Sequence, residues 1–281
     1  MRVSLGYVAS WREIAFALLD VPQGGVIAQM DVKDRFSSAA DDYAKYRPDY
    51  PADVVHACAD YAALPAGAAI VDIGCGTGIS SRLFARHGYA VTGVEPNAPM
   101  RAKAIEAGSG PAYKEGEAAK TGLADGCADM ITCAQALHWF NLDDCVAEWQ
   151  RILNPQGACA AFWNYRADTG WQAEYESLLL EWSSEYADVQ KAVDGGQDNS
   201  AWVKASPLCG DVAEREFPNA QRMDFTALLG RANSSSYVIH GVADKPRFER
   251  ALKTLFDRHQ QEGHVSFSYR TYVLLWRFPV R

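Results

Sequence analysis

The feature that most constrains the fold of this chain is a short apolar run that leads directly into three closely spaced glycines. Residues 69–73 read Ala-Ile-Val-Asp-Ile, and residues 74–78 read Gly-Cys-Gly-Thr-Gly. The apolar run is typical of a buried strand, and glycines remove side chains where a backbone bends tightly and a ligand lies close to it. Residues 80–87 then have the pattern of a helix that ends at Gly88. The sequence therefore predicts a strand, a glycine turn and a helix.

The same alternation of apolar runs and helical patterns continues along the chain. Near-continuous apolar strands that alternate with helices favour a parallel sheet covered by helices on both faces. We therefore expect an α/β fold with a doubly wound Rossmann-like sheet, mostly parallel with an antiparallel last strand, plus a mainly helical lobe. The further predicted strands are residues 90–95, 128–133, 158–163 and 264–278, and the helices of the sheet layers are residues 99–107 and 143–153.

These patterns divide the chain into four parts. We expect residues 1–29 to form an N-terminal extension and residues 30–62 a helical lid over the ligand site, interrupted at the prolines of residues 47–51. Residues 63–165 and 264–281 are expected to form the core. The remaining part, residues 166–263, is expected to be a helical lobe that contacts the substrate, with its helices at residues 171–193 and 244–261.

Composition excludes several broad classes of protein. With 281 residues, 48% hydrophobic and 22% charged, the chain can bury a large core, so general disorder is excluded. A net charge of −8 argues against a nonspecific nucleic-acid partner, which normally requires a basic face. No apolar run approaches the roughly 18 residues that span a bilayer, so no membrane partner is expected. The 7 cysteines form no CxxC pair and no zinc-like cluster, which predicts no metal site and a cytoplasmic, reduced protein.

The glycine turn departs from the pattern that binds dinucleotides. That fingerprint is G-x-G-x-x-G, whereas this turn reads G-x-G-x-G and position 79 is isoleucine. Asp72 precedes the glycines, and a carboxylate there suits a cationic amine better than a pyrophosphate. Glu95 ends the second strand, where an acidic side chain can accept both ribose hydroxyls of a nucleoside. An NAD-dependent oxidoreductase is therefore disfavoured, and a nucleoside that carries an amine is favoured.

Residues 71–78, together with Glu95-Pro96-Asn97, resemble the first two motifs of the class I S-adenosylmethionine-dependent methyltransferases. Further matches are Gly116-Glu117-Ala118, where the family places an acidic residue near the adenine, and residues 134–140 after the fourth strand. The segment around residues 36–51 resembles the lead-in of the type 11 branch that includes trans-aconitate methyltransferases. The resemblance implies S-adenosylmethionine as cofactor and S-adenosylhomocysteine as product. The cofactor-binding residues it implies are Tyr43, Arg47, Asp72, Gly74, Cys75, Gly76, Gly78, Glu95, Pro96, Glu117, Ala118 and Gln135.

Four residues are candidates for contact with the methyl acceptor. His138 and Trp139 follow a strand end that should face the methyl group, and His138 is a candidate catalytic base. A neutral ring packed against a backbone carbonyl is the alternative for His138. Trp163 is a candidate wall of the pocket, with core packing as its alternative. Arg231 lies in a segment that resembles a late motif of the same branch, and a helix end with a polar cap is the alternative there.

Methyl transfer from a sulfonium is an in-line displacement, so the protein mainly aligns the reacting atoms, which can lower the barrier by about 7–11 kcal/mol. We expect a methyltransferase that acts on a small molecule, with a carboxylic acid as one candidate acceptor. One alternative is a noncatalytic S-adenosylmethionine-binding protein. Another is a methyltransferase for tRNA or protein, which would predict a basic surface or an added domain. The sequence predicts neither the acceptor's identity nor the oligomeric state.

Overall fold

The computed structural model describes residues 45–167, 170–188 and 199–279. The predicted extension and the first part of the predicted lid, residues 30–44 with Tyr43 among them, lie outside the described residues. A seven-stranded sheet has the order β3-β2-β1-β4-β5-β7-β6, in which β7 runs antiparallel to both of its neighbours and the other pairs are parallel. The predicted fold class is confirmed. The strands are β1 (Ala69–Ile73), β2 (Ala90–Val94), β3 (Ala112–Lys114), β4 (Ala128–Ala134), β5 (Leu153–Arg166), β6 (Gly210–Met223) and β7 (Val265–Arg277).

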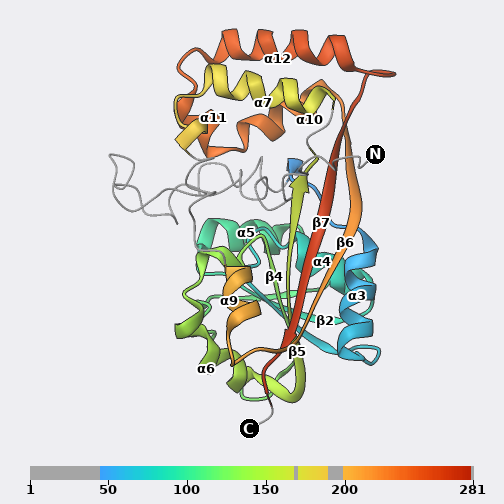
Figure 1. Cartoon of the computed structure of the whole chain (residues 1–281), viewed down its shortest axis with the longest axis vertical. Helices are drawn as coiled ribbons and strands as arrows, with labels where there is room; N and C mark the ends of the chain where they lie inside the picture. Colours follow the sequence, from blue (N-terminus) through green and yellow to red (C-terminus); the bar gives the residue numbers. More distant parts are fainter. Residues whose placement is uncertain (1–44, 168–169, 189–198, 280–281) are drawn as a thin grey trace, which may run out of the picture.

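Helices form two groups around this sheet (Figure 1). One group covers the faces of the sheet, and the other gathers into a separate lobe at the end where β5, β6 and β7 extend beyond the shorter strands. The sheet helices are α3 (Ala52–Ala62), α4 (Ile79–Arg86), α5 (Ala98–Glu106), α6 (Leu142–Ile152) and α9 (Asn199–Ala205), and a 3-10 turn, η1, spans Leu137–Trp139. The lobe helices are α7 (Trp171–Trp182), α10 (Phe225–Asn233), α11 (Ser236–Gly241) and α12 (Lys245–His259).

Two strands were not predicted from the sequence, β3 and β6. Strand β6 falls within the segment expected to be a helical lobe, and it pairs along its length with β7 at the edge of the sheet. Its sequence is rich in charged residues and contains Pro218, features that edge strands tolerate and that hide the alternating pattern of a strand. The helix predicted at residues 171–193 ends earlier, because Ser183 is extended and forms a bridge with Val242.

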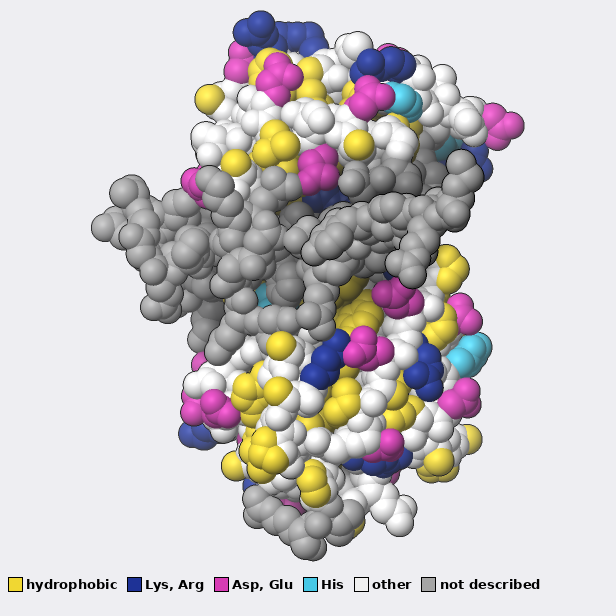
Figure 2. Space-filling model, in the orientation of Figure 1, with side chains coloured by type: hydrophobic (Ala, Val, Ile, Leu, Met, Phe, Trp, Pro, Cys, Tyr) yellow, Lys and Arg dark blue, Asp and Glu magenta, His cyan; other side chains and the backbone are white. Residues whose placement is uncertain are grey.

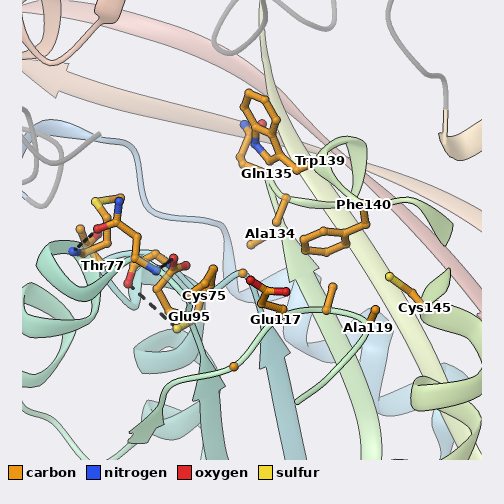
Figure 3. Close-up of a pocket in the computed structure, with 18 of the residues that line it drawn as sticks. Cys75, Thr77, Glu95, Glu117, Ala119, Ala134, Gln135, Trp139, Phe140 and Cys145 are labelled. Atoms are coloured by element: carbon orange, nitrogen blue, oxygen red, sulfur yellow. Dashed lines mark hydrogen bonds between the residues drawn. The ribbon is translucent and has the colours of Figure 1, made fainter. Parts of the chain in front are cut away.

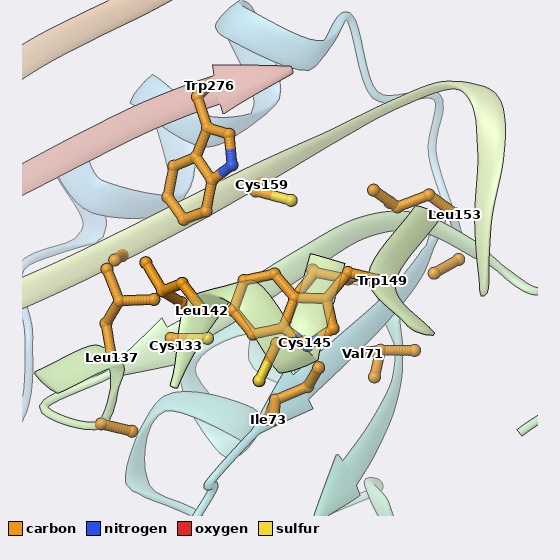
Figure 4. Close-up of a cluster of buried hydrophobic side chains, with 14 of the residues drawn as sticks. Val71, Ile73, Cys133, Leu137, Leu142, Cys145, Trp149, Leu153, Cys159 and Trp276 are labelled. Atoms are coloured by element: carbon orange, nitrogen blue, oxygen red, sulfur yellow. The ribbon is translucent and has the colours of Figure 1, made fainter. Parts of the chain in front are cut away.

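Alternation along β1 separates the two hydrophobic layers of the core. Ile70 packs with α3 and α4 on one face of the sheet. Val71 and Ile73 pack on the other face with α6, where Trp149 lies at the centre of the cluster (Figure 4). Because successive strand residues point to opposite faces, Asp72 points toward α4, the same side as Ile70. The direction of Asp72 therefore follows from the register of β1.

The helical lobe has a hydrophobic core of its own. It combines α7, α10, α11 and α12 with the end of β6 at Met223 and the start of β7 at Val265. Phe267 and Tyr269 of β7 also belong to this cluster, whereas Trp276 near the other end of the same strand packs in the sheet layer with α6. Strand β7 thus contributes to both cores and connects the lobe to the sheet.

No helix among the described residues is long and apolar enough to cross a membrane. No group of three His, Cys, Asp or Glu side chains in the described ranges is arranged to hold a metal ion. All of the cysteines are free thiols, and burial raises the pKa of Cys133, which keeps that thiol protonated at neutral pH.

Glu148 of α6 fixes the loop between β3 and β4 against the helix layer. Its carboxylate accepts hydrogen bonds from Arg151 at 2.8 Å and from the backbone N–H of Thr121 at 2.8 Å, and it also accepts one from the Thr121 hydroxyl. The bonds from Arg151, followed by those from Thr121, lower the pKa of Glu148 to about 2. Next to it, Trp149 Nε1 donates to Ala118 O at 2.9 Å, so α6 holds this loop at two points.

We expect Glu148→Gln to lower the free energy of unfolding by about 1–2 kcal/mol at neutral pH. Because the folded-state pKa lies below the unfolded value near ~4.3, this stabilisation is complete above that unfolded value and is lost as pH falls toward 2. Urea unfolding of both proteins at neutral and acidic pH measures the gap. Glu106→Gln, which removes an exposed pair with Lys103, is the control. A gap that stays constant with pH would contradict the assignment.

Candidate active site

The glycine turn between β1 and α4 forms the floor of a cavity of about 480 Å³. Gly74, Gly76 and Gly78 all have positive φ, between 56° and 79°. The backbone N–H groups of Gly74 and Cys75 both donate to Val94 O, at 2.9 and 3.2 Å, which ties the turn to the end of β2. The turn therefore has a fixed shape with its backbone exposed to the cavity.

Close packing also forbids a side chain at the first glycine. A Cβ atom on Gly74 would lie 2.9 Å from Ala136 Cβ and 3.0 Å from Phe140 Cζ. Gly78 is equally crowded, by Tyr113 and Arg82, whereas a Cβ on Gly76 would meet only Met100 at 3.5 Å. The first glycine is thus required by a neighbour that its backbone fixes, whereas the side-chain ends near Gly78 can move and its positive φ is the stronger reason for a glycine there. The middle glycine gives a ligand access to the backbone.

Glu95 lies directly after β2 and faces the same cavity (Figure 3). Its Oε2 accepts from the backbone N–H of Gly76 at 2.8 Å and its Oε1 accepts from that of Asn97 at 2.8 Å. Burial raises the pKa of Glu95, while these two backbone donors and Arg101 act in the opposite direction. Each carboxylate oxygen retains a lone pair for a ligand. The carboxylate is therefore fixed in place and presents two acceptors to the cavity.

The wall beside Glu95 is formed by the loop that α6 holds. Glu117 pairs with Lys120 through backbone hydrogen bonds at 3.1 and 3.0 Å, and its side chain points into the cavity in Figure 3. The predicted residues that line the cavity are Gly74, Cys75, Gly76, Glu95, Pro96, Glu117, Ala118, Gln135 and Trp139. The structure thus brings most of the predicted cofactor residues together around one space.

Gln135 and Trp139 lie together at the end of the cavity away from Glu95 (Figure 3). Gln135 follows β4 with a φ of +53°, an uncommon conformation for a residue with a side chain. Its backbone N–H donates to Phe162 O at 2.9 Å, which anchors it to β5. The Trp139 side chain is 36% exposed. An aromatic ring that is partly open to solvent suits contact with a ligand better than core packing.

Asp72 does not line the cavity, because it points toward α4. It is fully buried, and its carboxylate accepts from the hydroxyls of Ser80 at 2.5 Å, Ser81 at 2.6 Å and Thr132 at 3.0 Å. Burial raises the pKa of Asp72, and the three hydroxyls partly offset that rise. Asp72 therefore joins β1, β4 and the start of α4 beneath the glycine turn. The direct contact with a cofactor amine stays a prediction.

His138 is half-buried beside Trp139, with its ring centroid 5.1 Å from that of the tryptophan, and it is not part of the cavity wall. Burial lowers the pKa of His138 to about 4. The imidazole is therefore neutral at physiological pH, and a base of such low pKa is a poor match for proton transfer at neutral pH. The role of catalytic base stays a prediction.

The other predicted residues lie outside the cavity wall. Trp163 is 4% exposed and packs in the sheet layer against Tyr272, with ring centroids 5.9 Å apart, which agrees with its core-packing alternative. Arg47 donates from Nη2 to Ser234 O at 3.3 Å, and Arg231 is 3% exposed within the helical lobe. Both arginines thus lie toward the lobe, and their contacts with a ligand stay predictions.

Several residues of the wall were not predicted to bind the cofactor, although one of them, Asn97, stood in the second motif. Asn97, whose Oδ1 accepts from Met100 N at 3.0 Å, caps α5 and places both residues on the cavity. Tyr50 reaches the cavity from the segment before α3, and its ring packs edge-on against Phe162 at 4.8 Å. Cys145 comes from the first turns of α6. Cys145 could have been predicted from the short link between β4 and α6, because this link brings the start of α6 to the carboxyl edge of the sheet.

The residues of the cavity fit the predicted cofactor. A volume of about 480 Å³ lies within the range of roughly 300–1,000 Å³ for small-molecule sites. Glu95 offers two fixed acceptors for a diol, and the glycine turn leaves its backbone open to the cavity at Gly76. A nucleoside with an amino-acid tail requires two aligned hydrogen-bond acceptors and an open stretch of backbone.

Comparison with known proteins gives one family match and several relatives. Residues 71–161 match a family described as a methyltransferase domain. An uncharacterised methyltransferase-like protein of Schizosaccharomyces pombe is 30% identical over 153 residues, which are 54% of this chain and 59% of that protein. Malonyl-[acyl-carrier protein] O-methyltransferase of Pectobacterium atrosepticum is 36% identical over 95 residues, 34% of this chain and 38% of that enzyme.

The chain spans about three-fifths of the length of that yeast relative and less than two-fifths of the bacterial enzyme. A solved structure from Anaeromyxobacter dehalogenans, assigned provisionally to the type II methyltransferases, has a TM-score of 0.60 and 23% identity. That similarity covers 82% of this chain and 97% of the other, and it concerns the fold alone.

Proposed function

We propose that this chain methylates a small carboxylic acid. It belongs, through its domain at residues 71–161, to the class I S-adenosylmethionine-dependent methyltransferases. The observation that carries the proposal is the position of Glu95, whose carboxylate is oriented by Gly76 N and Asn97 N into the cavity beside the glycine turn. The cofactor is S-adenosylmethionine, which supplies an electrophilic methyl group on a sulfonium.

Each wall of the cavity has a separate task in this proposal. Glu95 accepts hydrogen bonds from the two ribose hydroxyls, and the loop at Glu117 and Ala118 borders the adenine. The turn at Gly74 and Gly76 leaves room for the methionine part beside the backbone. Asp72 keeps the turn in shape from below, through the hydroxyls that join it to α4 and β4. These tasks together place the reacting centre near Gln135 and Trp139.

A carboxylic acid is favoured as the acceptor for two reasons. An ionised carboxylate needs no base, which agrees with the absence of His, Lys and Arg from the described part of the cavity wall. The bacterial relative is named as an O-methyltransferase of malonyl-[acyl-carrier protein]. The protein's work is then to hold a carboxylate oxygen in line with the methyl group and to exclude water.

The alternative acceptors, tRNA and protein, would require a basic surface beside the cavity. On the face shown in Figure 2, the Lys and Arg side chains of the described residues are scattered among acidic and uncharged ones. The net charge of −8 points the same way. A small anionic molecule can still bind, because it needs only a local site.

Transfer of a labelled methyl group from S-adenosylmethionine to a panel of small carboxylic acids tests the proposed function. We expect S-adenosylhomocysteine to accumulate together with an ester that mass spectrometry identifies. Tight binding of S-adenosylhomocysteine without turnover on any small acid, amine or alcohol would instead support the noncatalytic reading. Turnover on tRNA or protein alone would overturn the proposed acceptor.

His138 gives a pH test of the carboxylate acceptor. With an ionised acceptor, we expect kcat/KM to be flat from about pH 5.5 to about pH 8, and His138→Gln to lower it less than about tenfold. If His138 were a general base, it would raise kcat/KM about 10²–10⁴-fold. The pH profile of kcat/KM would then fall on its acidic side near the His138 pKa of about 4, and His138→Gln would remove that fall. His56→Gln, far from the cavity beside His87, is the control. A loss above about 100-fold would assign catalysis to His138.

A further inference from the structure

Arg231 is a buried cation with weak support from the described residues. Its side chain lies in α10 and the residue is 3% exposed. Nη1 donates to Ser235 Oγ at a long 3.4 Å, and Nε has no hydrogen-bond partner in the described part of the chain. No acidic side chain within those ranges forms an ion pair with it. A buried charge with so few partners is strongly unfavourable, so the site calls for an anion.

A second arginine approaches from the sheet. Arg166, the last residue of β5, donates from Nη2 to Tyr186 Oη at 3.3 Å, and its guanidinium lies 5.9 Å from the centre of the Tyr175 ring. Tyr186 Oη in turn donates to Glu176 at 3.2 Å. Within the described ranges Arg166 forms no direct ion pair, and the Glu176 carboxylate that acts on it lies beyond the phenol. The guanidinium edge that does not contact Tyr186 can therefore bind a planar anion in a bidentate manner.

Tyr237 lies between the contacts of the two arginines, because its ring packs against Tyr186, which accepts from Arg166, and it follows closely after Ser235, which accepts from Arg231. It is 1% exposed, and its ring packs edge-on against Tyr186 with centroids 4.8 Å apart. Burial raises the pKa of Tyr237, but Arg166 and Arg231, helped by the Ser235 hydrogen bond and by Arg47, lower it below its usual value. For a fully buried phenol this net direction is unusual. The direction agrees with the two arginines lying on either side of this phenol.

This cluster lies on the acceptor side of the active site. Phe162 of β5 pairs with Ala134, which lines the cavity, and Arg166 is four residues further along the same strand. At about 3.3 Å per residue the two Cα atoms are about 13 Å apart, and both side chains point to the same face of the sheet. Gln135 Nε2 also donates to Asn164 O at 3.4 Å, midway between them. In Figure 1, the end of β5 leads from the sheet to the helical lobe.

We propose that Arg166, Arg231 and Tyr237 form an anion subsite for the acceptor, separate from the cofactor cavity. It binds a carboxylate or phosphate group that is not the methylated one, about 10 Å from the reacting atom. The acceptor is then an elongated molecule with two functional groups, one held by the arginines and one presented near Gln135. This inference rests on the proposed function, because it assigns the acceptor side of the same site.

Anion binding to the full chain loaded with S-adenosylhomocysteine tests the subsite. The probes are succinate, glutarate and inorganic phosphate at constant ionic strength, with chloride as the reference. We expect at least one of the three to raise the melting temperature by about 4 °C or more at saturation, and calorimetry to give one site. Stronger binding of the dicarboxylates identifies a carboxylate subsite, and stronger binding of phosphate a phosphate subsite.

Arg231→Met is the decisive variant, because methionine keeps the length of the side chain and removes its charge. We expect it to weaken anion binding more than about tenfold and to leave the affinity for S-adenosylhomocysteine within about twofold. Without added anions it should melt at the same temperature as wild type or higher, because it removes an uncompensated buried charge. Arg250→Met, on the exposed face of α12, is the control.

Two results would overturn the subsite. One is wild-type protein that binds S-adenosylhomocysteine but that no tested anion stabilises. Because the cofactor product still binds, this result would contradict the subsite without contradicting the proposed function. The other is a lower melting temperature for Arg231→Met with unchanged anion binding, which would assign the arginine to an ion pair within the chain. If Arg231→Met does not fold, Arg166→Gln, at a half-buried position, is measured in the same way and should show the same loss.

Discussion

Replacement of Glu95 by alanine is expected to weaken the binding of S-adenosylhomocysteine at least about 100-fold. Two charge-assisted hydrogen bonds to a ribose are worth about 1.5–3 kcal/mol each, and both are lost together. The change also leaves the backbone N–H groups of Gly76 and Asn97 without their acceptor, so the turn and the start of α5 lose a shared anchor. Isothermal titration of each variant with S-adenosylhomocysteine measures the effect.

Matched variants separate the ribose contact from a general loss of structure. Glu115→Ala removes a neighbouring carboxylate that is 78% exposed and pairs with Arg101, and it should bind S-adenosylhomocysteine like wild type. Glu95→Gln keeps one acceptor and should fall between wild type and Glu95→Ala. A folded Glu95→Ala protein whose affinity for S-adenosylhomocysteine lies within about threefold of that of wild type would show that Glu95 does not bind the ribose.

Gly74→Ala is expected to lower the free energy of unfolding by about 3 kcal/mol or more, and to weaken cofactor binding strongly. Positive φ alone costs a residue with a Cβ about 1–2 kcal/mol. At Gly74, where φ is +68°, the new Cβ would also lie 2.9 Å from Ala136 Cβ, an atom fixed by its backbone. The turn must then move away from its position against β2. Urea unfolding and calorimetric titration measure the two effects.

Gly67→Ala supplies the control for backbone strain. Gly67 has a similar φ of +75°, but nothing lies within 4 Å of a Cβ built there. We expect it to cost about 1 kcal/mol and to leave cofactor binding unchanged. The difference between the two variants measures the close approach at the turn. Equal losses of stability in both would mean that the crowding at Gly74 contributes nothing.

The sheet and the cofactor side of the site could be predicted because their signals are local in the sequence. The apolar run before Gly74 specifies β1, the three glycines specify the turn, and the position of Glu95 after the next apolar run places it at the same edge of the sheet. Parallel strands bring their carboxyl ends together, so adjacent motifs become neighbours in space. Most of the predicted cofactor residues therefore line one cavity.

The acceptor side could not be predicted in the same way, because it depends on contacts between distant segments. Arg231 was a candidate from its motif, but Arg166, 65 positions earlier, was not. Both arginines lower the pKa of Tyr237, and they are brought near it only because α10 packs against the long strand β6. Strand β6 was missed because its charged residues and Pro218 suit an edge that only β7 pairs with. The direction of Asp72 depended on which face of β1 carries α4.

The most direct test of the central claim is calorimetric titration of S-adenosylhomocysteine into the wild-type chain after removal of any bound ligand, with NAD titrated in parallel. We expect one site that binds S-adenosylhomocysteine with a dissociation constant in the micromolar range, about 1–100 μM, and no binding of NAD. Folded, ligand-free protein that binds no S-adenosylhomocysteine, or that binds NAD instead, would contradict the assignment of the cavity at Glu95 and the glycine turn.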